Sequence, residues 1–213
     1  MRLPESVDLE KLQMMQKLIA GKAVFYDDFE KLEIVGGGDA SYLGDRACGA
    51  MVTFRGQEIL EKVFARTKAD FPYIPTYLSF REMKPLLECY RKLEVKPDLI
   101  FFDGQGRAHP RRCGLATHLG VMLDVPSIGV AKSRLCGEHR PLQLRRGAFE
   151  YLHHEGEIVG AAVCTRDGTK PVYVSQGHRV FLKTAIKLTL EYSRSRIPEP
   201  VRCADALSKE CRK

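Results

Sequence analysis

The sequence predicts an α/β protein built around a mixed β-sheet. Three strand-like segments follow one another at 32–40, 46–54 and 57–65, separated by short turn signals. Two uniformly apolar runs, at 99–102 and 125–131, then enclose a segment with helical spacing. Strands joined by short turns pair as an antiparallel meander, whereas a strand–helix–strand unit pairs in parallel. We therefore expect a five-stranded central sheet, three strands antiparallel and two parallel, flanked by helices.

The first expected element is a helix that precedes this sheet. Apolar residues recur at helical spacing over 9–19, with Ser6 as the expected N-cap and Gly21 as the end. After the meander, the proline-containing FPYIP segment predicts a stiff loop. A helix should follow it, with Pro85 in the first turn, where proline is tolerated.

The later elements are expected in the order helix, strand, strand, helix. The segment RRCGLATHLGVML (111–123) predicts the helix between the two apolar runs. Residues 148–164 and 171–175 are typical of additional strands, and 181–192 has the pattern of an amphipathic helix. The basic, proline-containing end after it is left without an assigned element.

The composition is that of a globular protein. The 213 residues are 44% hydrophobic and 29% charged, enough to bury one core, so we expect a single domain over 1–213. No apolar run approaches the ~20 residues of a membrane span, and the N-terminal residues lack an apolar export segment. The seven cysteines are spaced at least eight residues apart, which excludes CxxC pairs and predicts buried thiols. We expect a cytoplasmic protein with no membrane partner.

The positive charge is concentrated in the second half of the chain. The net charge is +7, yet residues 1–103 carry 15 basic and 17 acidic groups, whereas residues 104–213 carry 19 and 10. A basic half favours a polyanionic partner, and nucleic acid is the simplest one. A cationic surface that only serves solubility is the alternative.

Two aspartates stand where a carboxylate needs a partner. Asp39 lies within an apolar strand and Asp103 ends a later buried one, and an unpaired buried charge is costly. If the two strands are neighbours, both carboxylates meet in one cleft, which outlines a divalent-metal site. Glu82, after the PYIP segment, is the natural third ligand. The alternative is that these are ordinary turn or capping residues.

The loop after Asp103 has the sequence GQGRAHP, which invites comparison with a dinucleotide-binding loop. That motif requires a third glycine where His109 stands, and Pro110 removes a backbone donor. The glycines more simply allow a flat ligand or another backbone segment to approach closely.

Several motifs together resemble a known family. In chain order they are VGGGDASY, FPYIPTYLSFRE, PDLIFFDGQGRAHPRRCGLATHLG, VPSIGVAKSRL, VSQGHR and RIPEPVR. They are similar to those of endonuclease V, a family of deoxyinosine-directed repair nucleases, over roughly residues 30–203. The resemblance implies a ribonuclease H-like fold, which agrees with the meander and the strand–helix–strand unit.

The resemblance also implies the catalytic residues. Asp39, Glu82 and Asp103 would hold Mg²⁺, with Mn²⁺ as a substitute, against the scissile phosphate. Lys132 matches a catalytic lysine that stabilises charge or orients water, and His178 matches a histidine near the same cleft that assists proton transfer. Without the family, Lys132 would be interpreted as a solvated lysine at a strand end and His178 as a structural histidine.

Recognition of a damaged base in a duplex requires a wedge and a pocket, because the base must leave the stack. The stiff apolar turn formed by Pro72, Tyr73, Ile74 and Pro75 is the expected wedge. The resemblance places the base pocket along residues that are mostly small, so that backbone N–H groups can reach a purine. These residues are Gly104, Gly106, His109, Gly114, Leu115, Gly129 and Leu135.

The chain departs from the family pattern at a few positions. Lys183 stands where many relatives have an acidic residue, which puts a fourth carboxylate in doubt. Thr76 replaces the glycine that usually follows PYIP. The run Gly36 to Gly38 receives no functional explanation from the sequence.

The function implied is that of a Mg²⁺-dependent endonuclease acting on DNA that contains deoxyinosine. It would flip the base and hydrolyse the second phosphodiester bond on the 3′ side, leaving 5′-phosphate and 3′-hydroxyl ends, with a monomer sufficient to bind one duplex. One alternative is an endoribonuclease specific for inosine in RNA. Another is a module that recognises hypoxanthine without cutting.

Overall fold

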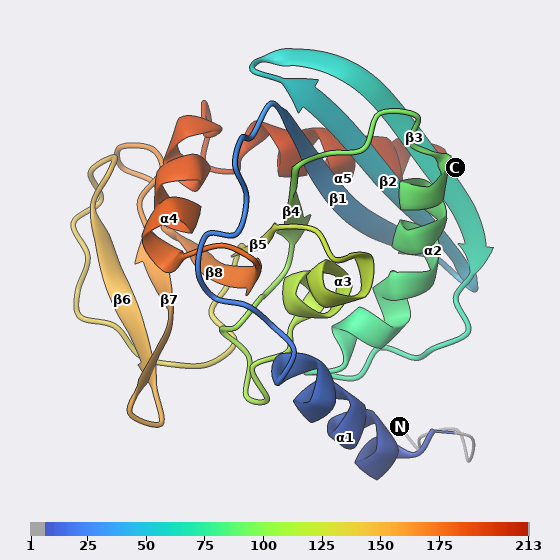
Figure 1. The fold of residues 1–213 in the computed structure, drawn as a ribbon, viewed down its shortest axis with the longest axis horizontal. Helices are drawn as coiled ribbons and strands as arrows, with labels where there is room; N and C mark the ends of the chain where they lie inside the picture. Colours follow the sequence, from blue (N-terminus) through green and yellow to red (C-terminus); the bar gives the residue numbers. More distant parts are fainter. Residues whose placement is uncertain (1–6, 213) are drawn as a thin grey trace.

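The structure, a computed structural model, describes residues 7–212. Its centre is an eight-stranded mixed sheet with the spatial order β3-β2-β1-β4-β5-β8-β7-β6 (Figure 1). The strands are β1 (Ile34–Leu43), β2 (Arg46–Arg55), β3 (Glu58–Lys68), β4 (Leu99–Asp103), β5 (Ser127–Ala131), β6 (Phe149–His154), β7 (Glu157–Val163) and β8 (Val172–His178).

The α/β class and the mixed sheet are confirmed, but the expected number of five strands is wrong. The five strands are present, and the sheet continues beyond them because β8 pairs antiparallel with β5, β7 with β8, and β6 with β7. All residues of β5 are buried, so an unpaired edge there would leave backbone groups without partners. The additional strands expected after residue 148 supply that pairing.

The register between β1 and β4 positions the later site. β1 pairs antiparallel with β2 and parallel with β4, and Gly38 lies opposite Phe102. The next residue on each strand is an aspartate. The two strands that carry Asp39 and Asp103 are therefore neighbours in the sheet, as expected.

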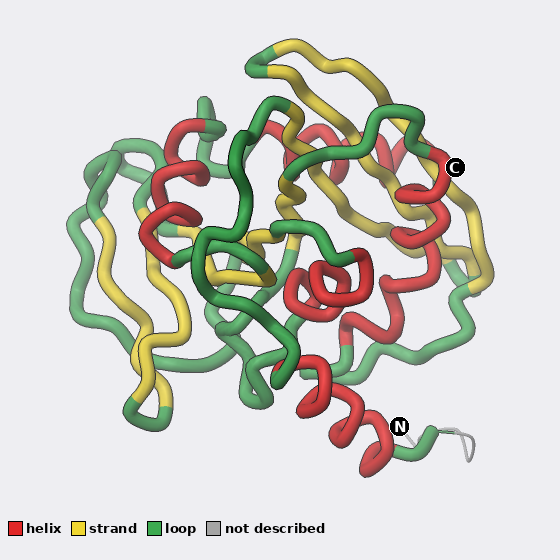
Figure 2. Tube along the Cα trace, viewed as in Figure 1, coloured by secondary structure: helices red, strands yellow, loops and turns green. Residues whose placement is uncertain are grey.

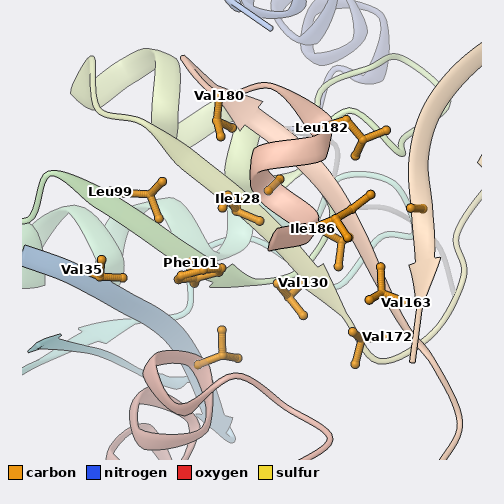
Figure 3. Close-up of a cluster of buried hydrophobic side chains, with 14 residues drawn as sticks. Val35, Leu99, Phe101, Ile128, Val130, Val163, Val172, Val180, Leu182 and Ile186 are labelled. Carbon is orange, nitrogen blue, oxygen red and sulfur yellow. The ribbon is translucent and has the colours of Figure 1, made fainter. Parts of the chain in front are cut away.

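Five helices accompany the sheet in the described residues: α1 (Leu9–Ala20), α2 (Leu78–Lys92), α3 (Leu115–Leu123), α4 (Leu182–Glu191) and α5 (Glu199–Cys211). Figure 1 shows α2 and α3 in front of the sheet and α5 behind it. Side chains of β4 alternate between the two layers, with Ile100 and Phe102 in the core under α2 and α3. Leu99 and Phe101 join α4 and α5 in the second core (Figure 3). Burial of both faces explains the uniformly apolar run.

Helix α2 differs from the expectation at its proline. Pro85 lies inside the helix rather than in its first turn. A proline there provides no N–H for the carbonyl of Arg81, four residues earlier. The Tyr42 hydroxyl donates to that carbonyl instead, at 3.1 Å. Gly49 of β2 faces Pro85, where a β-carbon would overlap the proline carbonyl, so the interrupted helix packs closely on the sheet.

The ends of other helices also differ from the expectations. The expected cap Ser6 lies outside the described residues, and the Asp8 side chain accepts from the backbone N–H of Lys11 at the start of α1. Helix α3 begins only at Leu115, because residues 104–114 form an irregular loop between β4 and the helix (Figure 2). The end of the chain, left unassigned, forms α5, with proline in its first turn.

The glycine run of β1 has a structural explanation. A β-carbon on Gly37 would overlap the carbonyl of Pro200 in α5. A β-carbon on Gly38 would lie 2.9 Å from the Phe102 ring, on the other side. The missing side chains therefore allow α5 to cross β1 at close range, which carries α5 to the place where the pairing of β1 with β4 ends.

The expectation that all cysteines are thiols is wrong for one pair. Cys48 of β2 and Cys211 at the end of α5 form a disulfide, with Cα atoms 6.3 Å apart. The two residues are 163 positions apart in sequence, and the crossing of α5 brings them together. Within residues 7–212, no helix has the length and apolar character that crossing a membrane requires.

Candidate active site

Three aspartates meet where the parallel pairing of β1 with β4 ends. Asp39, Asp103 and Asp205 each offer a carboxylate oxygen, and these oxygens all lie within 4.8 Å of one another. Asp39 and Asp103 come from neighbouring parallel strands, and Asp205 comes from α5, which crosses beneath them. We call these three residues the acidic cluster. Like charges this close are unfavourable without a compensating cation.

Asp205 was missed by the sequence reasoning. The segment after Pro198 buries Val201, Ala204 and Ser208 at intervals of three and four residues, so helical spacing was available as a signal. The doubt about a further carboxylate rested on Lys183. That residue is exposed on α4, and the additional carboxylate comes from α5 instead.

Glu82 lies near the cluster but is not one of its three members in the described part of the chain. Its side chain is on α2, and the residue is only 6% exposed. Burial, followed by the charges of Asp39 and Asp103, raises the pKa of Glu82 well above its usual range. The Oε2 atom is buried without a hydrogen-bond partner. A buried carboxylate oxygen without a donor is a candidate for a cation ligand.

The charged forms of Asp39 and Asp103 are unfavourable in the cluster unless a positive charge is nearby. Burial and the neighbouring Asp103 raise the pKa of Asp39 to about 7. Burial also raises the pKa of Asp103, against the opposing effect of Lys132. Both pKa shifts indicate that the protein stabilises the two negatively charged carboxylates less well than water does. A bound cation would reverse the direction of these shifts.

Lys132, directly after β5, is the nearest cation. Its Nζ lies 2.5 Å from Asp103 Oδ2 and 3.5 Å from Asp205 Oδ1. Partial burial lowers the pKa of Lys132, but its hydrogen bond to Asp103 and the negative charges of the three aspartates together outweigh this and raise the pKa overall. The side chain therefore stays an ammonium group. Burial alone would raise the pKa of Asp205, yet Lys209 and Lys132 lower it below its usual value.

Asp39 is held in place by a serine of α5. The Ser208 hydroxyl donates to Asp39 Oδ2 at 2.9 Å. Ser41, two residues along β1, donates to the Ser208 carbonyl at 2.6 Å. These two hydrogen bonds tie β1 to α5 next to the cluster, and they fix the orientation of the buried carboxylate.

A cavity of about 330 Å³ adjoins the cluster: Asp103 of the cluster and the neighbouring Lys132 both line it. We call it the base cavity, since a volume of this order suits a small planar ligand. Five of the seven expected pocket residues line it, namely Gly104, His109, Gly114, Leu115 and Leu135. The sequence reasoning missed further lining residues, which include Leu78, Ser79, Gln105, Cys113 and Ser133.

The other two expected pocket residues, Gly106 and Gly129, are not among the residues that line the cavity. A β-carbon on Gly106 would overlap the carbonyl of Gln176 in β8. A β-carbon on Gly129 would overlap the backbone of the loop at Gly106. These glycines let the 104–114 loop lie against the sheet, so they shape the cavity from outside its lining.

His109 lines the cavity, but the protein uses both of its ring nitrogens. Nε2 lies 2.9 Å from the Thr76 carbonyl, and Nδ1 accepts from the backbone N–H of Arg111 at 3.1 Å. Burial lowers the pKa of His109 to about 4, so the ring is neutral. The proton therefore sits on Nε2, which donates to Thr76.

The expected wedge, Pro72 to Pro75, forms a turn at the rim of the cavity, and we call it the finger. Tyr73 is 62% exposed, and both Tyr73 and Pro75 line the opening. Pro72 and Ile74 are half-buried. An exposed aromatic ring between two prolines has little conformational freedom to lose on contact with a ligand.

The structure does not bring His178 to the cluster. His178 ends β8 and lies opposite Ser127 at the start of β5, whereas Asp103 lies opposite Val130. Three residues of strand separate the two levels, which is about 10 Å. His178 instead accepts from the Val24 N–H through Nδ1 and lies 3.3 Å from Asp124 through Nε2. The antiparallel direction of β8 carries the histidine to the opposite edge.

An acidic cluster with a lysine at the ends of paired parallel strands, opening into a cavity of base size, is suited to holding a phosphodiester beside a recognised base. Fold and site together define a nuclease of the α/β class.

Comparison with known proteins identifies the kind of nuclease. Residues 16–206 match the model of the endonuclease V family. An endonuclease V of Dictyoglomus turgidum is 48% identical, over 94% of this chain and 89% of the relative. The chain therefore belongs to the endonuclease V family.

Solved structures agree with this assignment. The crystal structure of endonuclease V from Streptomyces avermitilis has a TM-score of 0.90 and 35% identity, covering 99% of this chain and 96% of the other. Endonuclease V of Ciona intestinalis, solved with a DNA containing an inosine followed by a ribo-adenosine, has a TM-score of 0.82 and 28% identity, covering 95% and 96%.

Proposed function

We propose that this chain is a Mg²⁺-dependent DNA repair endonuclease that recognises deoxyinosine by base flipping. It hydrolyses the second phosphodiester bond 3′ to the lesion and leaves 5′-phosphate and 3′-hydroxyl ends. The observation that carries the proposal is that Asp103 belongs to both the base cavity and the acidic cluster, and that its ion-pair partner Lys132 also lines the cavity. A base in the cavity therefore places its own strand against the carboxylates. The Ciona relative, solved with inosine-containing DNA, supports the same substrate class.

The donor set fits a hard divalent cation. The three aspartates of the cluster offer carboxylate oxygens at mutually compatible distances, and Glu82 holds a buried oxygen without a partner. All four are oxygen ligands, which Mg²⁺ prefers and Mn²⁺ also accepts. Asp39, Asp103 and Asp205 would hold the ion, with Glu82 next to them. The ion would supply charge neutralisation at the phosphate and a water of lowered pKa.

The chain's own residues prepare this reaction. Ser208 orients the Asp39 carboxylate. Lys132 holds a permanent positive charge between Asp103 and Asp205, where it can stabilise negative charge that grows on a phosphoryl oxygen. His178 has no part in the proposal, because it lies at the other edge of the sheet.

Base selection follows from the lining of the cavity. Hypoxanthine presents an acceptor oxygen where adenine presents an amino group. A backbone N–H of the cavity lining that faces this position would pair with the first base and remain unsatisfied with the second. The difference is worth ~1–3 kcal/mol. The N–H groups of Gly104 and Gly114 are not available for this, because they donate to the carbonyls of Val130 and Gly106. Tyr73, at the rim, fills the place that the flipped base leaves in the stack.

The test is a cleavage assay with the Asp39→Ala variant on a duplex that carries one deoxyinosine. Wild-type protein should nick the inosine strand in Mg²⁺ and not in EDTA. The variant should lose cleavage while it retains affinity for the inosine duplex. Asp167→Asn, which changes an exposed aspartate that accepts from the Arg146 N–H, serves as the matched control. Cleavage by Asp39→Ala at the wild-type rate would refute the assignment of the metal site.

A second candidate is cleavage of inosine-containing RNA. The DNA bound to the Ciona relative has a ribonucleotide directly after the inosine, so a 2′-hydroxyl at that position suits at least one family member. A matched RNA in the same assay decides between the substrates. The non-cleaving recognition module is disfavoured, because a pure binder has no use for three clustered carboxylates near a phosphate.

The remaining assignments are part of the same proposal. The continuous eight-stranded sheet supports a single domain over 1–213, and the order of β1 to β5 supports a ribonuclease H-like fold. One cavity and one cluster suffice for one duplex, so the protein would act as a monomer. We also propose a cytoplasmic location.

A further inference from the structure

The residue that follows the finger has an unusual backbone conformation. Thr76 has a φ of 69°, in the left-handed region, which a β-branched residue rarely adopts. Such a conformation is strained and persists only where the surroundings enforce it. The structure contains the groups that enforce it.

Three side chains donate to the Thr76 carbonyl. Gln16 Nε2 and His109 Nε2 each lie 2.9 Å from this oxygen. Arg111 Nη2 lies 3.0 Å from the same oxygen and 2.6 Å from the Thr76 hydroxyl. The guanidinium thus holds both oxygens of one residue, which restricts its backbone and its side chain together.

Gln16 connects this arrangement to the N-terminal helix. It is fully buried, at 0% exposure, and its Oε1 accepts from Arg111 Nε at 2.5 Å. Its amide nitrogen is also 3.4 Å from the Cys113 carbonyl. A buried amide is costly unless its groups are paired, and here each of them has a partner. Helix α1 is therefore docked on the root of the finger through a polar contact that requires this geometry.

Tyr77, the next residue, is held from the same two sides. The Arg111 guanidinium lies over its ring at 4.5 Å from the centroid. Gln13, also on α1, donates to the Tyr77 hydroxyl at 2.9 Å. We call Gln16, His109 and Arg111 the finger anchor.

We infer that Gln16 and Arg111 are positioning residues for lesion recognition: they fix the finger at the rim of the base cavity before any nucleic acid binds. The role in lesion recognition rests on the proposed function, whereas the immobilisation of the finger is a property of the free protein. A finger fixed in advance loses less conformational entropy on entering a base stack.

The chain offers a direct reporter, because it contains no tryptophan. The Tyr73→Trp variant places a single indole on the finger, and time-resolved fluorescence anisotropy then separates local motion from tumbling. In this background the fast, local component should be small. Adding Gln16→Leu or Arg111→Lys should raise its amplitude at least twofold. The matched control is Arg146→Lys, since Arg146 also binds main-chain carbonyls, those of Thr165, Leu190 and Ser193, and none on the finger.

Position 76 provides a second, conservative pair of variants. Thr76→Ser keeps the hydroxyl that Arg111 binds and should behave like the parent. Thr76→Val keeps the branched shape without the hydroxyl, and its fast component should rise. If Gln16→Leu fails to fold, as circular dichroism would show, Arg111→Lys and this pair still decide the matter. An unchanged anisotropy decay in all of them would overturn the inference.

An activity readout separates this inference from the proposed function. With intact Tyr73, Gln16→Leu and Arg111→Lys should raise KM for the inosine duplex about tenfold and leave kcat within twofold, because the acidic cluster is untouched. If wild-type protein fails to cut inosine DNA, the proposed function falls while the anisotropy result stands. If the anisotropy changes but KM does not, the anchor has no part in recognition.

Discussion

The acidic cluster and the finger anchor each contribute one residue to the lining of the same cavity, Asp103 and His109. The two regions differ in whether their polar groups find partners within the protein. In the anchor, each polar group of Gln16 has a partner, and the histidine is neutral. In the cluster, burial and mutual repulsion raise the pKa of Asp39 and Asp103, and next to it the Oε2 atom of Glu82 has no donor. The polar groups of the anchor are paired within the protein, whereas the carboxylates of the cluster require a bound cation to be stable in their charged form. Predictions follow from disturbing one side or the other.

The largest effect is expected from Asp205→Asn, which removes one charge of the cluster and keeps the shape. Cleavage of inosine DNA in Mg²⁺ should fall about 1000-fold, which corresponds to about 4 kcal/mol of transition-state stabilisation. Affinity for the inosine duplex, measured in EDTA, should stay within about threefold. Cleavage that is unaffected would remove Asp205 from the site and leave the cluster without its α5 member.

The next effect concerns the finger. Tyr73→Ala should weaken binding to the inosine duplex by ~1–3 kcal/mol, the usual worth of a base–aromatic stack. The loss should be smaller for an undamaged duplex, where no base is flipped. Fluorescence titrations with both duplexes measure the difference. Equal losses would show that Tyr73 only adds general affinity, and the finger would then not be a wedge.

The raised pKa of Asp39 predicts how the cluster responds to pH. Its folded-state pKa of about 7 lies above the ordinary value of 3.8, so the folded protein binds the extra proton between these values. The free energy of unfolding in EDTA should therefore fall as pH rises from about 4 to about 7. A metal ion must displace this proton, so its apparent affinity should rise about tenfold per pH unit below pH 7.

Melting curves in EDTA and in Mg²⁺, at pH 5.5 and pH 8, measure this coupling. The increase of Tm caused by Mg²⁺ should be clearly larger at pH 8. The same increase at both pH values would show that no buried carboxyl loses a proton on metal binding. The finger anchor should contribute nothing to this difference, because His109 stays neutral over the whole range.

The smallest effect is expected from Ser208→Ala, which removes the hydroxyl that orients Asp39. Losing a hydrogen bond to a buried carboxylate should lower kcat about tenfold at most, by ~1 kcal/mol or slightly more. Ser195→Ala, whose hydroxyl donates to the Ile197 carbonyl instead, is the matched control. A kcat unchanged by Ser208→Ala would mean that a bound ion orients Asp39 without help.

The two regions also differ in how far the sequence predicts them. The meeting of Asp39 and Asp103 follows from local patterns, because each strand is apolar and the order of elements makes them neighbours. The anchor joins residues 16, 76, 109 and 111, from three separate segments. No periodicity connects such residues, so only the assembled fold reveals them.

The errors have the same origin. Asp205 was missed because the terminal helix was not assigned, although its buried positions have helical spacing. His178 was placed near the cleft because the direction of β8 is not written in its own residues; pairing with β5 decides it. The sheet has eight strands rather than five because β5 requires a partner on its free side. In each case a tertiary contact, which the local sequence pattern does not contain, decided the outcome.

One measurement tests the central claim most directly, that the base cavity and the acidic cluster act on a single strand at a fixed spacing. An end-labelled duplex with one deoxyinosine is incubated with wild-type protein in Mg²⁺, and the nick is mapped to the nucleotide. The account predicts one product, cut at the second phosphodiester bond 3′ to the inosine and absent in EDTA. Cuts scattered along the strand, or cleavage that persists in EDTA, would contradict it.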